Sequence, residues 1–271
     1  MTVYRTDEDL QSEDGYGLVD THCHLDLEPL CSQLPALLDG ARRAGVTRYV
    51  VPGVHPKGWE HLLRVAEQHA GVYPAFGIHP MHADTATDST LSRLAEYATR
   101  GVAIGEIGLD STCVVQMDCQ ERAFRDQVRL AVSHKLPVLL HCRKAFQRTI
   151  RILEEEGACE VGGIMHAFSG SPEMAKEFIR LGFVISLCGT VTWQGATRPV
   201  RLARGIPLES IVLETDAPDL SPHPFRNQPN RPAWLVEVLA QVAAIRGVSA
   251  ACLARTTRET SRRILKIPII S

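Results

Sequence analysis

The chain has 271 residues, of which 45% are apolar, and its formal net charge at pH 7 is −2. This length is sufficient for one large domain with a substantial core, and the balanced charge excludes a disordered chain or a protein that coats nucleic acid with a basic surface. No apolar run approaches the roughly 20 residues of a membrane-spanning helix, so no membrane association is predicted.

Residues 1–15 are acidic and lack an apolar stretch, so we expect a flexible N-terminal extension followed by a single domain over residues 16–271. The eight cysteines are scattered and form no Cys-x-x-Cys pair, which favours free thiols over disulfides or a zinc–thiolate site. These features predict a cytoplasmic protein. Nothing in the sequence indicates a specific protein partner.

Eight runs rich in Val, Ile and Leu recur along the chain. They cover residues 17–22, 48–54, 72–80, 102–110, 137–142, 162–170, 183–190 and 211–218. Because these runs are continuous rather than alternating, they are typical of strands that are buried on both faces of a parallel sheet. Helical periodicity falls between and after them, over residues 34–45, 59–71, 118–135, 145–157, 171–182, 234–247 and 249–265.

This alternation of strands and helices favours a (β/α)₈ TIM barrel, an α/β fold of one domain. A doubly wound open sheet has a similar periodicity and is the alternative. We find no internal repeat and no linker that would divide the chain.

Polar residues with metal-binding side chains gather at the carboxyl ends of the predicted strands. In the stretch DTHCHLD, His22 and His24 stand two residues apart after the first strand, so both side chains face one side. Taken alone, this pair fits either two metal ligands or two half-buried polar residues. The other polar residues that end strands are His79, Glu106, Asp110, His141, His166, Glu214 and Asp216.

In a parallel barrel all of these strand ends meet at one rim, where the catalytic site of such barrels is built. A convergent set of imidazoles and carboxylates is typical of metal-assisted hydrolysis and suits two divalent ions such as Zn²⁺, Mn²⁺, Co²⁺ or Ni²⁺. We therefore predict a dinuclear metal site at the C-terminal rim of the barrel. Its predicted metal ligands are His22, His24, Glu106, His141, His166 and Asp216.

Within this set, Glu106 lies midway in the barrel order and is the predicted bridge between the two ions. His22 and His24 would hold one ion, and His141 and His166 would hold the other. Asp216 would bind metal weakly or act as the general base that takes a proton from the attacking water. Glu106 and Asp216 are thus the predicted catalytic residues.

Six ordered motifs closely resemble those of the TatD family of metal-dependent deoxyribonucleases, which belongs to the amidohydrolase superfamily. They are DTHCHLD, GIHP, IGEIGLD, LHCRKA, MHAFSGS and ETDAPDLSP, and the resemblance extends from about Leu18 to Leu265. It implies the same barrel, the same six metal ligands and hydrolysis of phosphodiester bonds in DNA with Mg²⁺ or other divalent ions.

The resemblance also implies substrate contacts. It places His79 and Arg143 near the substrate phosphate, and Asn230, with Arg226 and Arg231 nearby, beside the substrate backbone. Many members of the family carry aromatic residues after IGEIGLD, where this chain has Ser111-Thr112-Cys113. Trp193 is a candidate replacement for this stacking surface, since base stacking on an aromatic ring contributes roughly 1–3 kcal/mol per base.

The leading functional hypothesis is therefore a metal-dependent phosphodiesterase, a deoxyribonuclease of exonuclease type, with DNA or another phosphodiester in a local cleft. One alternative is hydrolysis of an amide, ester, lactone or small phosphodiester at the same dinuclear site, because the fold does not fix the substrate. A non-catalytic binding protein that kept the barrel is a further alternative. The complete set of ligand residues argues against it.

Overall fold

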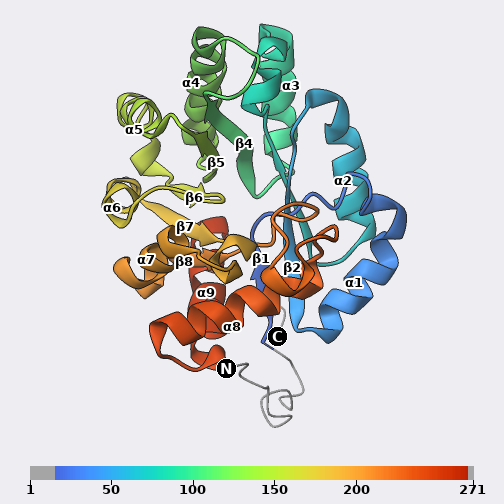
Figure 1. Ribbon diagram of the computed structural model, residues 1–271. Helices are drawn as coiled ribbons and strands as arrows, with labels where there is room; N and C mark the ends of the chain where they lie inside the picture. The colour runs from blue at the N-terminus through green and yellow to red at the C-terminus, as the bar shows by residue number, and fades with distance from the viewer. Residues whose placement is uncertain (1–15, 268–271) are drawn as a thin grey trace.

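The computed structural model describes residues 16–267, which form a barrel of eight parallel strands surrounded by helices (Figure 1). The predicted extension, residues 1–15, lies outside the described residues. The strands are ordered from β1 to β8 without a crossover, and every pair of neighbours along this order is parallel. This order confirms the predicted TIM barrel and rules out the doubly wound open sheet.

The strands are β1 (Leu18–Asp20), β2 (Val46–Pro52), β3 (Val72–Phe76), β4 (Ala103–Asp110), β5 (Val138–Arg143), β6 (Gly163–Met165), β7 (Phe183–Leu187) and β8 (Ile211–Leu213). The helices are α1 (Leu34–Arg43), α2 (Trp59–Gln68), α3 (Asp88–Ala98), α4 (Met117–His134), α5 (Phe146–Glu155), α6 (Pro172–Arg180), α7 (Thr197–Gly205), α8 (Leu235–Arg246) and α9 (Ala250–Leu265). Helices α3 and α7 were not among the predicted segments.

Several strands end earlier than the apolar runs that predicted them. Strand β8 stops at Leu213, whereas the run continues to Pro218, and β6 stops at Met165, whereas the run continues to Gly170. The residues that follow these strands turn across the rim, and they include His166 and Asp216. The apolar pattern thus includes the start of the loops that carry the site.

Strands β1 and β8 are joined mainly through residues just beyond their ends. The backbone N–H and the hydroxyl of Thr21 both donate to the carbonyl of Leu213, at 3.1 and 3.0 Å. The carboxylate of Asp20 accepts the backbone N–H of Thr215 at 2.9 Å and its hydroxyl at 2.5 Å. This junction brings the first and last strand ends of the site together.

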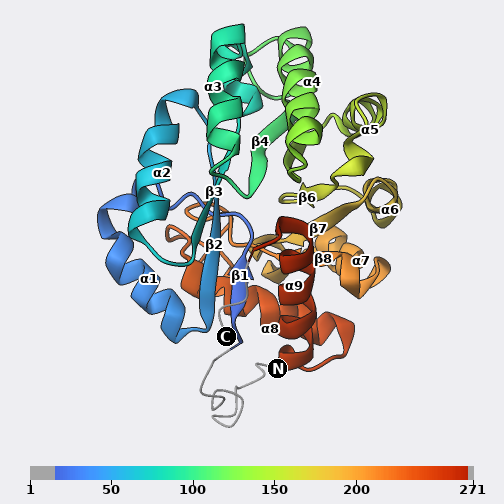
Figure 2. The same cartoon turned by 180° about the vertical axis from the view of Figure 1, so that it is seen from behind.

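The core has two layers. One layer lies inside the barrel and takes one small or branched residue from each strand, and it is completed by two residues at and just after the end of α9. Figure 2 shows α9 lying beside β1 and β8. This inner layer consists of Val19, Val50, Ala75, Ala103, Leu139, Ile164, Val184 and Val212, together with Leu265 and Ile267. The barrel interior is therefore a packed floor under the rim and not a pore.

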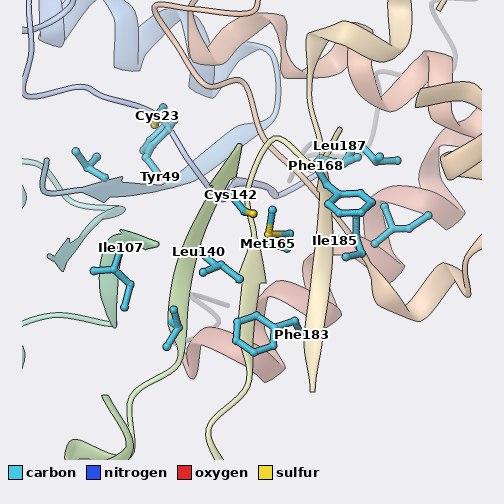
Figure 3. Packing of buried hydrophobic residues seen from close by; sticks show 14 of the residues in the cluster. Cys23, Tyr49, Ile107, Leu140, Cys142, Met165, Phe168, Phe183, Ile185 and Leu187 are labelled. Carbon is cyan, nitrogen blue, oxygen red and sulfur yellow. The ribbon is translucent and has the colours of Figure 1, made fainter. Parts of the chain in front are cut away.

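The second layer lies between the strands and the surrounding helices (Figure 3). Ile107, Leu140 and Ile185 point outward from β4, β5 and β7 and are completely buried there. Burial of each such side chain stabilises the fold by roughly 1.5–3 kcal/mol. This layer fixes the strand ends at which the polar residues are placed.

No helix within residues 16–267 is by itself long and apolar enough to cross a membrane. One pair, Pro232–Arg246 and Ala250–Leu265, reaches the required length and composition together, but the pair is bent by 109°.

Candidate metal centre

The six predicted ligands converge at one end of the barrel, from loops or strand ends far apart in the sequence. Their donor atoms, together with one of His79, form three overlapping groups. Within each group the donor atoms lie within 4.8 Å of one another. These groups are His22 with His24 and Glu106, His22 with His166 and Asp216, and His79 with Glu106 and His141. All of the predicted ligands thus belong to a single cluster of side chains.

Glu106 occupies the middle of this cluster. Its Oε2 atom lies 3.3 Å from Nε2 of His22, whereas its Oε1 atom lies 2.7 Å from Nδ1 of His141 and 3.5 Å from Nε2 of His166. The two carboxylate oxygens therefore face different histidines. This is the arrangement that a carboxylate needs in order to bridge two cations.

Asp216 lies beside the histidines that follow β1 and β6. Its Oδ1 atom lies 3.9 Å from Nε2 of His22, 3.8 Å from Nε2 of His24 and 4.0 Å from Nε2 of His166. The Asp216 backbone has a φ of 57°, in the left-handed region, and its N–H donates to the carbonyl of His22 at 2.9 Å. This contact between backbones holds the carboxylate over the His22 ring.

The donor set fits bound cations. His22 is completely buried, yet neither of its ring nitrogens makes a hydrogen bond, and Nδ1 of His24 is also buried without a partner. Buried polar atoms are rarely left unsatisfied, and an ion is one of the standard explanations where they are. Imidazole nitrogens and carboxylates, without thiolates, suit borderline and hard divalent cations.

Two carboxylates to which the sequence assigned no role contact His141 and His166. Each lies at the ring nitrogen that faces away from Glu106. Oδ2 of Asp110 lies 3.2 Å from Nε2 of His141, and Oε1 of Glu214 lies 3.2 Å from Nδ1 of His166. A carboxylate on the second nitrogen of a histidine fixes the orientation of the ring and makes it a stronger ligand. Their positions at strand ends, next to predicted ligands, were the only sequence signal for this.

Burial and neighbouring charges shift the pKa values of the side chains in the cluster in different directions. Burial alone would lower the pKa of His166, but Glu214, Asp216 and Glu106 raise it to about 10. Burial alone would raise the pKa of Glu106, but the surrounding histidines hold it well below its usual range. Burial, with Glu214 and Glu106, raises the pKa of Asp216 well above its usual value. A divalent cation would replace these protons, so its binding is coupled to proton release.

His79 is oriented differently from the other histidines. Its Nδ1 atom accepts the backbone N–H of Met81 at 3.2 Å, and burial lowers its pKa to about 4. The ring is therefore neutral at pH 7 with its proton on Nε2, which lies 3.6 Å from Oε1 of Glu106. A nitrogen that carries a proton is a hydrogen-bond donor, which suits contact with a substrate oxygen better than metal ligation.

The backbone beside the site is held by two buried glutamines of α4. Gln120 exchanges hydrogen bonds with the backbone N–H and carbonyl of Asp110, at 2.8 and 3.0 Å. Gln127 does the same with the backbone of Ile78, the residue before His79, at 2.7 and 3.2 Å. Neither glutamine was predicted, because their partners depend on how α4 packs against β3 and β4.

The predicted substrate residues differ in accessibility. Arg143 ends β5 and is exposed, and Arg226 has its guanidinium 4.1 Å from the centre of the Trp193 ring. Asn230 is only 1% exposed, and its amide group donates to the carbonyls of Thr215 and Asp219 at 2.7 and 2.8 Å. As placed, the Asn230 side chain holds the loop beside Asp216, and its contact with substrate stays a prediction.

A (β/α)₈ barrel with this set of imidazoles and carboxylates at its C-terminal rim defines a metal-dependent hydrolase. The profile of the TatD-related DNase family matches residues 19–266. The chain therefore belongs to the TatD family.

Named relatives and a solved structure agree with this assignment. The uncharacterised metal-dependent hydrolase YabD of Bacillus subtilis is 36% identical over 253 residues, covering 92% of this chain and 99% of the relative. The deoxyribonuclease TATDN3 of Homo sapiens is 32% identical, covering 92% of this chain and 95% of the relative. The crystal structure of YjjV, a TatD homologue of Escherichia coli, superposes with a TM-score of 0.88 at 32% identity, covering 93% of this chain and 99% of that one.

Proposed function

We propose that this chain hydrolyses phosphodiester bonds in DNA, with two divalent ions held by His22, His24, Glu106, His141, His166 and Asp216. The observation that carries the proposal is the position of Glu106, whose two oxygens face different histidines at 3.3 and 2.7 Å. The identity of the ions follows from the donor set only as a group: Zn²⁺, Mg²⁺, Mn²⁺, Co²⁺ or Ni²⁺.

When bound, the two ions would lower the pKa of water toward neutrality and neutralise charge on the phosphoryl oxygens. Asp216 is the general base in this proposal, because its carboxylate faces the cluster and is only partly buried. Glu106 keeps its negative charge, because the surrounding histidines hold its pKa low. It would thereby hold both cations without taking up the proton.

The proposed contacts with substrate use donors at the rim. His79 presents a protonated Nε2 toward the cluster, so it can donate to a non-bridging phosphate oxygen. Arg143 and Arg226 are cations at rim positions and supply charge for the flanking phosphates. The name of the human relative, a deoxyribonuclease, supports DNA as the substrate.

One observation favours a second candidate, a small phosphodiester or carboxylic ester with an apolar group. The exposed large hydrophobic residues within 16–267 are Leu27, Met81 and Val114. All three lie in loops that follow β1, β3 and β4, on the rim that carries the cluster. Apolar side chains at this position suit a compact apolar substrate rather than a charged polymer.

For the compartment, we propose the cytoplasm. All eight cysteines are free, and Cys159 is exposed. Free exposed thiols are typical of a reducing compartment.

The test is hydrolysis of 3′-labelled and 5′-labelled single-stranded DNA by chelator-treated protein to which Mg²⁺, Mn²⁺ or Zn²⁺ is added. We expect stepwise loss of nucleotides from one end, and a loss of roughly 10²–10⁴-fold in turnover in Asp216→Asn at equal metal content. Bis(p-nitrophenyl) phosphate and p-nitrophenyl acetate are tested in parallel. Cleavage of these small substrates without cleavage of DNA would contradict the proposal and favour the second candidate.

A further inference from the structure

A cleft lies between α6 and α7, outside the metal cluster. Its volume is about 360 Å³, and it is lined by Ser171, Pro172, Thr197, Arg198 and Arg201. The two helices lie side by side in both views of the barrel (Figures 1 and 2). Both begin in loops that follow strands of the barrel, so the cleft opens on the side of the molecule that carries the cluster.

The cleft is rich in positive charge. The segment from residue 188 to residue 208 contains Arg198, Arg201 and Arg204 and no aspartate or glutamate. This is unusual in a chain whose formal net charge is −2. Helix α7 begins at Thr197, within the cleft, and the N-terminal end of a helix also favours a negative charge.

Arg198 and Arg201 are both exposed, so their guanidinium groups are accessible to a ligand in the cleft. Arg198 donates to the carbonyl of Ser169 at 3.3 Å, which anchors one nitrogen of the guanidinium and keeps the side chain over the cleft. Glu173 is the carboxylate that competes for Arg201. Its own backbone N–H, then Ser171 and then Arg201 lower its pKa.

Short stretches of chain connect the cleft to groups that are proposed to lie beside the substrate. The loop after β7 carries Trp193, over which Arg226 is stacked, and four residues later it reaches Thr197 in the cleft. The loop after β6 carries His166 and reaches Ser171 in the cleft five residues later. A chain of phosphates that has one member at the metal cluster can therefore place another over Arg198 and Arg201.

We propose that this cleft binds a phosphate of the DNA strand away from the bond that is cleaved, with Arg198 and Arg201 as its ligands. The inference rests on the proposed function and deepens it, because it predicts a preference for substrates longer than a dinucleotide. Guanidinium groups suit this task, since they bind phosphate through paired, geometrically fixed donors.

The experiment compares the wild type with Arg198→Ala/Arg201→Ala, all with metal bound. The probes are a 12-nucleotide single-stranded DNA with phosphorothioate linkages, followed by fluorescence anisotropy, and the dinucleotide dTdT, followed by hydrolysis. We expect the double variant to bind the 12-mer at least roughly tenfold more weakly. The slope of log K against log salt should decrease by about 0.7 for each phosphate that the variant no longer neutralises. The kcat and KM for dTdT should stay unchanged.

Two further variants sharpen the test. Arg204→Ala removes one positive charge, half of what the double variant removes, from the same helix outside the cleft, so its affinity for the 12-mer should stay within about twofold of the wild type. Glu173→Gln removes the competing carboxylate, so its affinity should increase.

Two outcomes would contradict the proposals, and they can be told apart. If the double variant binds the 12-mer as the wild type does, or is weakened no more than Arg204→Ala, the cleft proposal is wrong while the nuclease function stands. If the wild type hydrolyses neither dTdT nor longer DNA, both proposals are overturned together.

Discussion

The imidazole of His141 lies between two carboxylates. Its Nδ1 atom lies 2.7 Å from Oε1 of Glu106, and its Nε2 atom lies 3.2 Å from Oδ2 of Asp110. Asp110 is itself fixed, because Oδ1 accepts the backbone N–H and the hydroxyl of Thr112 and its backbone is held by Gln120. The ring is thus oriented from the α4 side of the barrel by protein contacts alone.

We expect Asp110→Asn to weaken metal binding at the cluster by about 10–100-fold, because the neutral amide no longer orients and polarises the His141 ring. Titration of chelator-treated protein with Zn²⁺ against a competing dye measures this. Asp118→Asn, a change on the first turn of α4 away from the cluster, is the control. Equal affinities for the two variants would show that Asp110 has no part in ion binding.

Glu106→Ala should abolish hydrolysis and lower the metal content, while the barrel stays folded. The side chain is buried in the polar cluster rather than in either apolar layer, so its removal takes away the proposed bridge and little packing. Metal content by atomic emission and far-UV circular dichroism check the two halves of this expectation. Full activity at unchanged stoichiometry would refute the bridging role.

Glu156 provides a test of stability at a site away from the rim. It pairs with Arg125 at 2.6 Å and with Arg129 at 2.6 and 2.9 Å, linking α4 to the end of α5. Burial alone would raise the pKa of Glu156, but Arg129 and Arg125 lower it below its usual value. A carboxylate with a lowered pKa stabilises the fold above its unfolded-state pKa of about 4.3, and this stabilisation is lost as the pH falls through the lower folded-state pKa.

Glu156→Gln should therefore reduce the free energy of unfolding by up to about 1 kcal/mol at pH 7. The difference from the wild type should decrease as the pH falls below about 4. Urea unfolding at several pH values measures it, with Glu259→Gln on α9 as an exposed control. A difference that is independent of pH would mean that packing, and not charge, explains the effect.

Gly108 lies in β4 directly beside the backbone of His141 in β5. Its φ is 149°, and a Cβ atom added there would lie 1.8 Å from the carbonyl oxygen of His141. Gly108→Ala should therefore lower the free energy of unfolding by on the order of 3 kcal/mol or more. Gly58→Ala, where a Cβ would meet nothing within 4 Å, should change it by less than about 0.5 kcal/mol. Denaturation midpoints of the two variants decide whether close approach is the cause.

Much of the fold follows from the sequence because each strand is a continuous apolar run. The rim could be predicted as well, because His22, His141 and Asp216 stand at the ends of these runs and parallel strands share one direction. Helices α3 and α7 could not be recognised with the same ease. Helix α7 has only nine residues, buries only Leu202 and Ala203 and carries three arginines, so few apolar residues mark it in the sequence.

The contacts between side chains at the rim could not be predicted from the sequence. Asp110 and Glu214 stand beside predicted ligands, but only the register of β4 against β5, with Asp110 opposite Arg143, places the Asp110 carboxylate behind the His141 ring. For Asn230, the resemblance predicted a position beside the substrate. In the structure its amide group donates hydrogen bonds to the backbone carbonyls of Thr215 and Asp219. Such contacts depend on the path of the loop after β8, which local patterns do not encode.

The floor of the barrel has a consequence for biosynthesis. Its inner layer joins Val19, near the beginning of the described chain, to Leu265 and Ile267 at the far end of it. A ribosome-bound chain that already contains every proposed ligand still lacks the last two of these side chains. The inner layer can therefore be complete only after α9 has left the ribosomal exit tunnel.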